Sequence, residues 1–189
     1  FIGIDPSGTI ARPTTIGVNT GTTFASGMRI GGTTPAARNV MSGNSTAILF
    51  QAGSNHVVQG NFFGTDRNGT SAIANGSTAI TVQQSDDVMI GGTTAAARNI
   101  LAGGGGARGI FMGVAARTRI QGNFIGTDVT GTVALGFTGS GCAVCLDSNA
   151  SNTQVGGLTA TPGTPPGNVI SGSATGIRIG SSGNNFNNT

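Results

Sequence analysis

The sequence predicts an all-β fold in which short strands stack into a parallel β-solenoid, and the clearest sign is an internal repeat. Residues 62–70 (FFGTDRNGT) have near-copies at residues 1–9 (FIGIDPSGT) and 124–132 (FIGTDVTGT). A second motif keeps the same phase, because residues 30–39 (IGGTTPAARN) return as residues 90–99 (IGGTTAAARN). A fixed period of tens of residues is typical of a solenoid, in which each unit buries its apolar face by stacking on its neighbours.

The composition also favours β structure. The 189 residues include 35 Gly and no Trp or Tyr, only 8% are charged, and Lys and Glu are both absent. Helical surfaces usually draw on Lys and Glu, whereas Gly, Asn, Thr and Ser accumulate where short strands are separated by turns. Apolar residues that recur in phase supply buried rows, which disordered segments lack. The chain is therefore expected to be folded and rich in strands.

The repeat divides the chain into three units, residues 1–61, 62–123 and 124–189, which together form a single β-solenoid domain over residues 1–189. Five or six strands in each unit would make two three-sided coils per unit. Stacked at the spacing of neighbouring strands, about six such coils would form a rod roughly 30 Å long.

Short apolar segments between Gly, Asn, Ser and Thr turns mark the expected strands, and each is of strand rather than helix length. In the first unit they are residues 16–18, 28–30, 39–41, 47–50 and 57–60. In the second unit they are residues 80–82, 88–90, 99–101, 109–112 and 119–122. In the third unit they are residues 144–146, 153–155, 168–170 and 176–179.

Alternation along these strands predicts which side chains face the interior. The expected internal stack consists of Ile48, Phe50, Ile80, Val82, Ile110, Met112, Val144, Leu146, Ile177 and Ile179. The residues expected to face outward are Leu49, Thr81, Phe111, Cys145 and Arg178. Leu49 and Phe111 would then form an apolar surface patch, unless they lie under a loop or pack inside.

Three motifs resemble those of a known family: residues 122–128 (GNFIGTD), 90–93 (IGGT) and 168–172 (NVISG). They are similar to the N-x-I-G-T-D-x-x-G-T, I-G-G-T and N-x-I-S-G-N repeats of secreted bacterial parallel β-helix proteins with the pectate-lyase-like architecture. The resemblance covers essentially the whole chain and implies a right-handed parallel β-helix. Members of this architecture include polysaccharide lyases and hydrolases, adhesins, phage spikes and structural rods, so the resemblance implies no single function.

The aspartates of the first motif, Asp5, Asp66 and Asp128, are expected to organise tight turns. In the pattern D-x-x-G-T the carboxylate would accept backbone N–H bonds two or three residues further on, and Gly would supply a positive φ. Calcium binding is the alternative, since loops rich in oxygen hold hard cations. A catalytic role at three equivalent positions is not expected, because an active site is normally single.

Five asparagines also recur in place. Asn39, Asn99 and Asn168 precede equivalent strands, and Asn61 and Asn123 precede the Phe motif. Asn side chains at such corners stack into amide ladders along a solenoid, so a structural role is predicted.

Other chemistry-bearing residues give weaker signals. Asp86 and Asp87 are the only adjacent acidic pair, but adjacent residues of a strand point to opposite sides and would not converge on one glycosidic bond unless the turn redirects them. His56 is the lone histidine and lacks a partner nearby in sequence, so a turn histidine is expected. Cys142 and Cys145 form a C-x-x-C that is either free or joined in a local disulfide. No catalytic residue, cofactor or metal site is predicted apart from the calcium alternative.

The composition also limits the partners. The nine Arg residues are scattered, so the net charge of +3 does not indicate a nucleic-acid surface. No apolar run is long enough to span a membrane. Both ends of the chain resemble the middle of a repeat rather than a cap, which predicts end-to-end association through Phe1, Ile2, Ile177, Ile179 and Phe186.

The sequence therefore predicts a non-enzymatic structural protein of the extracellular space or cell surface, a rod that stacks end to end or forms part of a longer one. The alternative, argued from the family resemblance, is a β-helix that binds or cleaves a polysaccharide. It would use Arg117, Arg119 or Arg178 against acidic sugars and Asp86 or Asp147 in cleavage. Ice binding would need outward Thr on successive coils, and only Thr81 is expected there.

Overall fold

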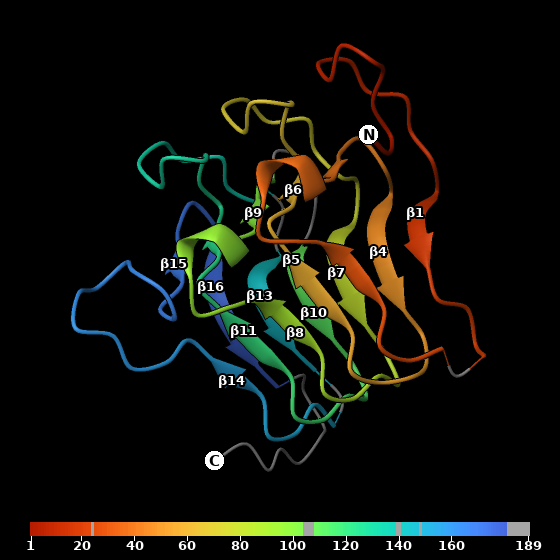
Figure 1. Ribbon diagram of the computed structural model, residues 1–189, viewed down its shortest axis with the longest axis vertical. Coiled ribbons are helices and arrows are strands. Elements are labelled where there is room, and N and C mark those ends of the chain that lie inside the picture. The colour runs from red at the N-terminus through yellow and green to blue at the C-terminus, as the bar shows by residue number, and fades with distance from the viewer. Residues whose placement is uncertain (24, 104–107, 139–140, 148, 181–189) are drawn as a thin grey trace.

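The computed structural model describes residues 1–23, 25–103, 108–138, 141–147 and 149–180. Within them the chain forms three parallel sheets, and each strand pairs with the strand three places further along the chain (Figure 1). Sheet 1 contains β1 (Ile16–Asn19), β4 (Thr46–Phe50), β7 (Thr78–Val82), β10 (Arg108–Met112), β13 (Cys142–Leu146) and β16 (Thr175–Ile179). Sheet 2 contains β2 (Arg29–Gly31), β5 (Val57–Gln59), β8 (Met89–Gly91), β11 (Arg119–Gln121) and β14 (Gln154–Val155). Sheet 3 contains β3 (Val40–Met41), β6 (Phe62–Phe63), β9 (Ile100–Leu101), β12 (Phe124–Ile125) and β15 (Val169–Ile170).

This topology confirms the all-β parallel solenoid with three sides. The only helical elements among the described residues are two single 3₁₀ turns, η1 (Pro35–Ala37) and η2 (Ala95–Ala97), at the equivalent place in two repeats. In the described part of the chain, no helix is long and apolar enough to cross a membrane.

The register confirms the expected internal stack of sheet 1. Ile48, Ile80, Ile110 and Val144 pair in succession along one row and are fully buried. Ile177 and Ile179 continue the two inward rows on β16 but are 44% and 60% exposed. The prediction was therefore right about the rows and wrong about burial at their end, because β16 is an edge strand that among the described residues pairs only with β13.

The outward row of sheet 1 differs in part from expectation. Leu49, Thr81, Phe111, Cys145 and Arg178 do share one register row. Leu49 and Phe111 are only half-buried, but Thr81 between them is buried and so is Cys145. The short side chains are buried because each lies between longer neighbours, and Cys145 is also tied back to Cys142 by a disulfide.

Sheet 3 is apolar on both faces. Its inner row, which includes Phe63 and Leu101, belongs to the main core. Its outer row forms a second cluster with Ile4 and Ile73, which come from the loops beside this sheet. That outer row consists of Val40, Phe62, Ile100, Phe124 and Val169. Burial on both sides explains why the strands of sheet 3 carry two consecutive large apolar residues instead of an alternating pattern.

Candidate functional site

The five predicted asparagines form one continuous ladder along the solenoid. Asn39, Asn61, Asn99, Asn123 and Asn168 stack in that order, each of the first four donating its backbone N–H and its side-chain amide to Oδ1 of the next at 2.9–3.3 Å. The amide groups of the last four also donate to backbone carbonyls, as Asn99 does to Val58 at 2.8 Å. Because every rung is bonded to its neighbours, the ladder holds the corner between sheets 2 and 3.

The three aspartates of the Phe motif each close a short hairpin turn. Oδ1 of Asp66 accepts the N–H groups of Thr70 at 2.8 Å and Ser71 at 3.1 Å, and Gly69 N–H donates to the Asp66 carbonyl at 3.0 Å. Asp5 and Asp128 make the same bonds in their own hairpins. The carboxylates therefore reach N–H groups four and five positions on as well as the expected nearer ones, since the backbone of Ser7 and of Thr130, two positions on, also bonds to Asp5 and Asp128.

The hairpin carboxylates are already occupied by donors. The Ser7 hydroxyl lowers the pKa of Asp5, and the Thr130 hydroxyl lowers that of Asp128, with further help from backbone N–H groups. In the described residues there is no cluster of three or more acidic, His or Cys side chains that could hold a metal ion. Each turn therefore supplies a calcium ion with only one carboxylate, and that carboxylate already accepts hydrogen bonds from the turn.

The Phe of each motif packs between a glycine and, in two cases, an arginine. A Cβ on Gly69 would lie 2.9 Å from the Phe62 ring, and one on Gly131 would lie 2.7 Å from the Phe124 ring. On the neighbouring coil the guanidinium carbon of Arg38 lies 4.1 Å from the centre of Phe62, and Arg98 lies 3.7 Å from that of Phe124. Positive φ at the glycines and cation–π contacts at the arginines thus explain why these residues recur in phase.

A column of left-handed residues runs along the turn that precedes sheet 2. The residue two positions before the start of each sheet 2 strand has a φ between 50° and 70°, and these residues are Gly27, Asn55, Asp87, Arg117 and Asn152. Backbone bonds join the coils here, for example from Asp87 N–H to the Ala116 carbonyl at 2.9 Å. Within this column the side chains of Asp87 and Arg117, on adjacent coils, bond to each other.

This conformation brings the adjacent acids together on one arginine. Arg117 makes a two-pronged bond to Asp87, with Nε–Oδ1 at 2.8 Å and Nη2–Oδ2 at 2.7 Å, and Nη2 lies 3.3 Å from Oδ2 of Asp86. Sequence reasoning expected the two carboxylates to diverge unless the turn redirected them, and the positive φ of Asp87 does redirect it. Hydrogen bonding to Arg117, together with its charge and that of Arg119, lowers the pKa of Asp87. Asp87 therefore stays ionised and is a poor proton donor for glycoside chemistry.

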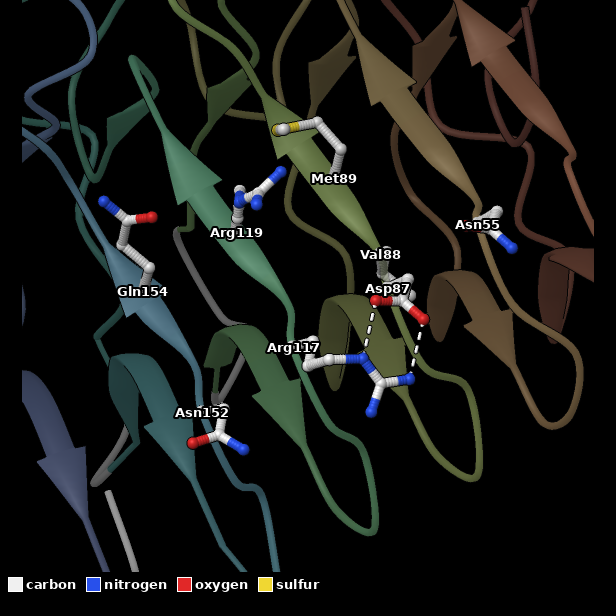
Figure 2. Close-up of a pocket in the computed structure, with 8 residues that line it drawn as sticks. All are labelled: Asn55, Asp87, Val88, Met89, Arg117, Arg119, Asn152 and Gln154. Atoms are coloured by element: carbon white, nitrogen blue, oxygen red, sulfur yellow. Dashed lines mark hydrogen bonds and ion pairs between the residues drawn. The ribbon is translucent and has the colours of Figure 1, made fainter. Parts of the chain in front are cut away.

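Beside this column, the outer face of sheet 2 forms a shallow trough (Figure 2). A depression of about 380 Å³ is bounded by Asn55, Asp87, Val88, Met89, Arg117, Arg119, Asn152 and Gln154. A second depression of about 250 Å³ lies around Arg29, Val57 and Gln59 on the same face. The outward register row of sheet 2 lines the trough and consists of Arg29, Val57, Met89, Arg119 and Gln154.

Sequence reasoning found only part of this trough. It proposed Arg117 and Arg119 together with Arg178, but Arg178 lies on sheet 1 and pairs with Asp147 at 3.2 Å. Arg29 was not predicted; the signal that could have found it is that Arg29, like Arg119, directly precedes a buried Ile of a sheet 2 strand. A trough with two exposed guanidinium groups separated by about three strand spacings suits an extended anionic chain.

His56 and the cysteines are structural in their geometry. His56 is fully buried and stacks on Phe50 with ring centres 4.5 Å apart. Its Nδ1 accepts the Met28 N–H at 3.3 Å and its Nε2 lies 3.2 Å from the Ala52 carbonyl, so Nε2 carries the proton. Of the two states that the sequence left open for the cysteines, free thiols or a local disulfide, the structure contains the disulfide Cys142–Cys145.

The predicted end-to-end residues lie at the two ends of the sheets. Phe1 is 55% exposed, and Ile2 bridges Met41 at the edge of sheet 3. Ile177 and Ile179 lie on β16 at the opposite end of the solenoid (Figure 1). Phe186 falls outside the described residues.

The fold places this chain in the class of three-sided parallel β-solenoids. Comparison of the chain with protein-family models, with curated proteins and with solved structures finds no match. Its function is therefore inferred from its own residues.

Proposed function

We propose that this chain is a non-enzymatic structural protein, a β-helical rod of the extracellular space or cell surface that self-associates end to end or forms a segment of a longer rod. The observation that carries the proposal is the exposure of core rows at β16. Ile177 and Ile179 continue rows whose other members are buried, yet they are 44% and 60% exposed. A sheet edge with inward apolar side chains in water is a template for a further strand.

Two features support the extracellular setting, and a third supports the role of a stiff rod. The chain carries a Cys142–Cys145 disulfide, and such bonds persist in oxidising compartments. Its Lys-free, Asn- and Thr-rich repeats also resemble those of secreted right-handed β-helices of the pectate-lyase-like type. A repeat held by an asparagine ladder and buried rows on every side suits a stiff, extended support.

Sedimentation velocity and electron microscopy of the isolated chain test the proposal. The wild-type chain should form larger, elongated species as its concentration rises, and the Ile177→Arg/Ile179→Arg variant should sediment as a folded monomer. Val114→Arg is the matched control, because Val114 is 50% exposed but lies away from both ends, at the turn between sheets 1 and 2. A wild-type chain that remains a monodisperse monomer at high concentration would refute end-to-end self-association.

Polysaccharide binding is the second candidate, and the trough on sheet 2 favours it. Arg29 and Arg119 present their guanidinium groups on one row, with the ion-paired Arg117 beside them. Binding fits better than cleavage, because Arg117 holds both nearby carboxylates.

Affinity electrophoresis through polygalacturonate or alginate tests this second candidate. The wild-type chain should be retarded, the Arg29→Ala/Arg119→Ala variant at least several-fold less so, and Arg12→Ala, a control elsewhere on the surface, should behave as wild type. Equal mobility of all three would count against it. Release of unsaturated or reducing ends that is lost in Asp86→Ala or Asp147→Ala would instead indicate cleavage.

A further inference from the structure

We infer that the peptide bond between Asp5 and Pro6 is a self-cleavage site, with the Asp5 carboxylate as the nucleophile. These two residues form the only Asp–Pro pair in the chain, and they open the turn of the first hairpin. The cleavage concerns the chemistry of one hairpin and is independent of how the rods assemble.

The hairpin places two groups that the reaction needs beside the scissile bond. Gly8 N–H donates to the Asp5 carbonyl at 2.9 Å, where it stabilises the oxyanion that develops when this carbonyl is attacked. The Asp5 carboxylate is fixed in the same turn, since Oδ1 accepts the N–H groups of Thr9 at 3.2 Å and Ile10 at 3.1 Å. Among the hydrogen bonds of the described residues, Oδ2 accepts only the Ser7 hydroxyl, at 2.8 Å. Oδ2 therefore keeps lone pairs for an attack on the carbonyl carbon.

Pro6 makes this bond easier to break than its equivalents in the other two hairpins. Arg67 and Val129 hold the same place there, and their backbone N–H groups each donate at 2.9 Å to a carbonyl of the preceding hairpin. Pro6 has no N–H, and the nitrogen of its tertiary amide is more basic and leaves as a secondary amine once it is protonated. All three hairpins thus supply a carboxylate and an N–H donor, but only the first also supplies the leaving group.

The reaction is a hydrolysis in two steps. Oδ2 of Asp5 attacks the Asp5 carbonyl carbon while the Pro6 nitrogen takes a proton from solvent, so a C–O bond forms and the C–N peptide bond breaks. The product of this step is a cyclic anhydride of Asp5 and a free Pro6 amine. Water then opens the anhydride, which gives Asp5 a free α-carboxylate and restores its side chain. The net change is the addition of one water molecule across the peptide bond.

Mild acid favours this reaction in the folded chain. The Ser7 hydroxyl is the main group that lowers the pKa of Asp5, and the backbone N–H groups of Ile10 and Thr9 add to the effect. The shift comes from hydrogen bonds and not from a neighbouring charge, although Arg67 of the second hairpin packs against Gly8. Asp5 therefore stays a carboxylate as the pH falls toward the ordinary Asp value of about 3.9, while protonation of the Pro6 nitrogen becomes more frequent.

The segments on both sides of the cut stay in place. Ile2 N–H donates to the Val40 carbonyl at 2.9 Å, and Ser42 N–H donates to the Ile2 carbonyl at 3.1 Å. Ile4 is buried in the apolar cluster on the outer face of sheet 3. The cut is therefore a nick that opens the hairpin while the solenoid keeps both segments, and it is detected in the denatured chain.

Mass spectrometry of the denatured chain after incubation at about pH 4.5 tests the site. The wild-type chain should give products that end at Asp5 and begin at Pro6. Asp5→Asn removes the nucleophile and Pro6→Ala removes the leaving group, so each should slow the cut about ten-fold or more. Asp66→Asn is the matched control, because it removes the equivalent carboxylate of the second hairpin and should leave the rate unchanged. A cut that persists at the wild-type rate in Asp5→Asn would overturn the assignment.

The contribution of the hairpin is measured by repeating the incubation in urea. The folded chain should be cut several-fold faster than the chain unfolded in urea at the same pH. An equal or slower cut in the folded chain would show the ordinary acid lability of an Asp–Pro bond and would overturn the inference.

A gain-of-function variant gives a second readout. Val129→Pro introduces the leaving group into the third hairpin, where Asp128 makes the same bonds as Asp5, and should add a cut after Asp128 that is visible on a denaturing gel. A variant with the circular dichroism of the wild type and no second cut would also overturn the role of the hairpin. End-to-end assembly is tested separately by sedimentation, so either proposal can fail without the other.

Discussion

At the scale of single residues, the asparagine ladder shows how polar side chains can be buried inside a solenoid. Asn61, Asn99 and Asn123 are fully buried, and a buried amide is tolerated only when its donors and acceptor are bonded. Each of these asparagines bonds to the coils on both sides. The ladder thus replaces the hydration of the corner amides and fixes the stagger of successive coils.

Replacing a central rung should be costly. Asn99→Ala leaves the buried Asn61 N–H without its acceptor and removes one of the two Asn99 donors to Asn123 Oδ1, so we expect a loss of about 2–4 kcal/mol in the free energy of unfolding. Asn39→Ala is the matched control, because Asn39 is the first rung and only donates, and it should lose about 1 kcal/mol. Urea unfolding followed by circular dichroism measures both, and equal losses would contradict a cooperative ladder.

At the scale of elements, the Phe motif is a hairpin that covers one face of the solenoid. The motif at residues 62–70 joins β6 to a turn in which Asp66 binds backbone N–H groups and Gly69 lies under the Phe62 ring. Successive hairpins also bond to each other, as Arg67 N–H does to the Gly8 carbonyl at 2.9 Å. Three of these hairpins, red, yellow and teal in Figure 1, project along one side of the molecule. They bury the outer row of sheet 3, which would otherwise be exposed.

Substitutions at two glycines distinguish the cost of a left-handed backbone from the cost of a close side-chain contact. Gly69 and Gly21 have similar φ values of 73° and 67°, but a Cβ at Gly69 would lie 2.9 Å from the Phe62 ring, whereas one at Gly21 would meet nothing within 4 Å. Gly21→Ala should therefore cost about 1 kcal/mol for its left-handed backbone alone. Gly69→Ala should cost more, about 2–4 kcal/mol, because the ring must also move. Thermal unfolding of the two variants tests this, and identical melting temperatures would contradict it.

At the scale of the whole molecule, stability depends on stacking that is equivalent at every level. Each coil is held by the coils on either side, so the interior rows are satisfied and the end rows are not. This is why Ile110 is fully buried while Ile177, in the same row, is 44% exposed. The geometry that buries the middle of each row therefore leaves Ile177 and Ile179 on the edge strand β16 partly exposed.

Acid should weaken the whole rod. The pKa values of Asp5, Asp87 and Asp128 are lowered in the folded chain, mainly by Ser7, Arg117 and Thr130 in that order. Their contribution to stability is fully present above the ordinary Asp pKa of about 3.9 and is lost as pH falls through the lower folded-state values.

A pH series of thermal melts measures this dependence. The melting temperature should be nearly constant from pH 7 to about pH 5 and should fall below about pH 4. Asp87→Asn, which removes one of the three shifted groups, should show a shallower fall. A melting temperature that rises as the pH drops below 4 would contradict the assignment.

The sequence by itself determined the periodic part of this protein. Repeats in phase predicted the parallel solenoid, the inward rows through Ile48 and Ile110, and the positions of all five ladder asparagines, because stacking equivalent coils converts a sequence period directly into spatial rows. Only the tertiary structure decided where side chains depart from strand alternation. The convergence of Asp86 and Asp87 on Arg117 depends on a left-handed φ, and the burial of Cys145 depends on its neighbours in adjacent coils. The period of the sequence decides which coil a residue belongs to and which residues of adjacent coils lie beside it. The backbone torsion angles at the turns and the size of the side chains on adjacent coils decide what that residue contacts.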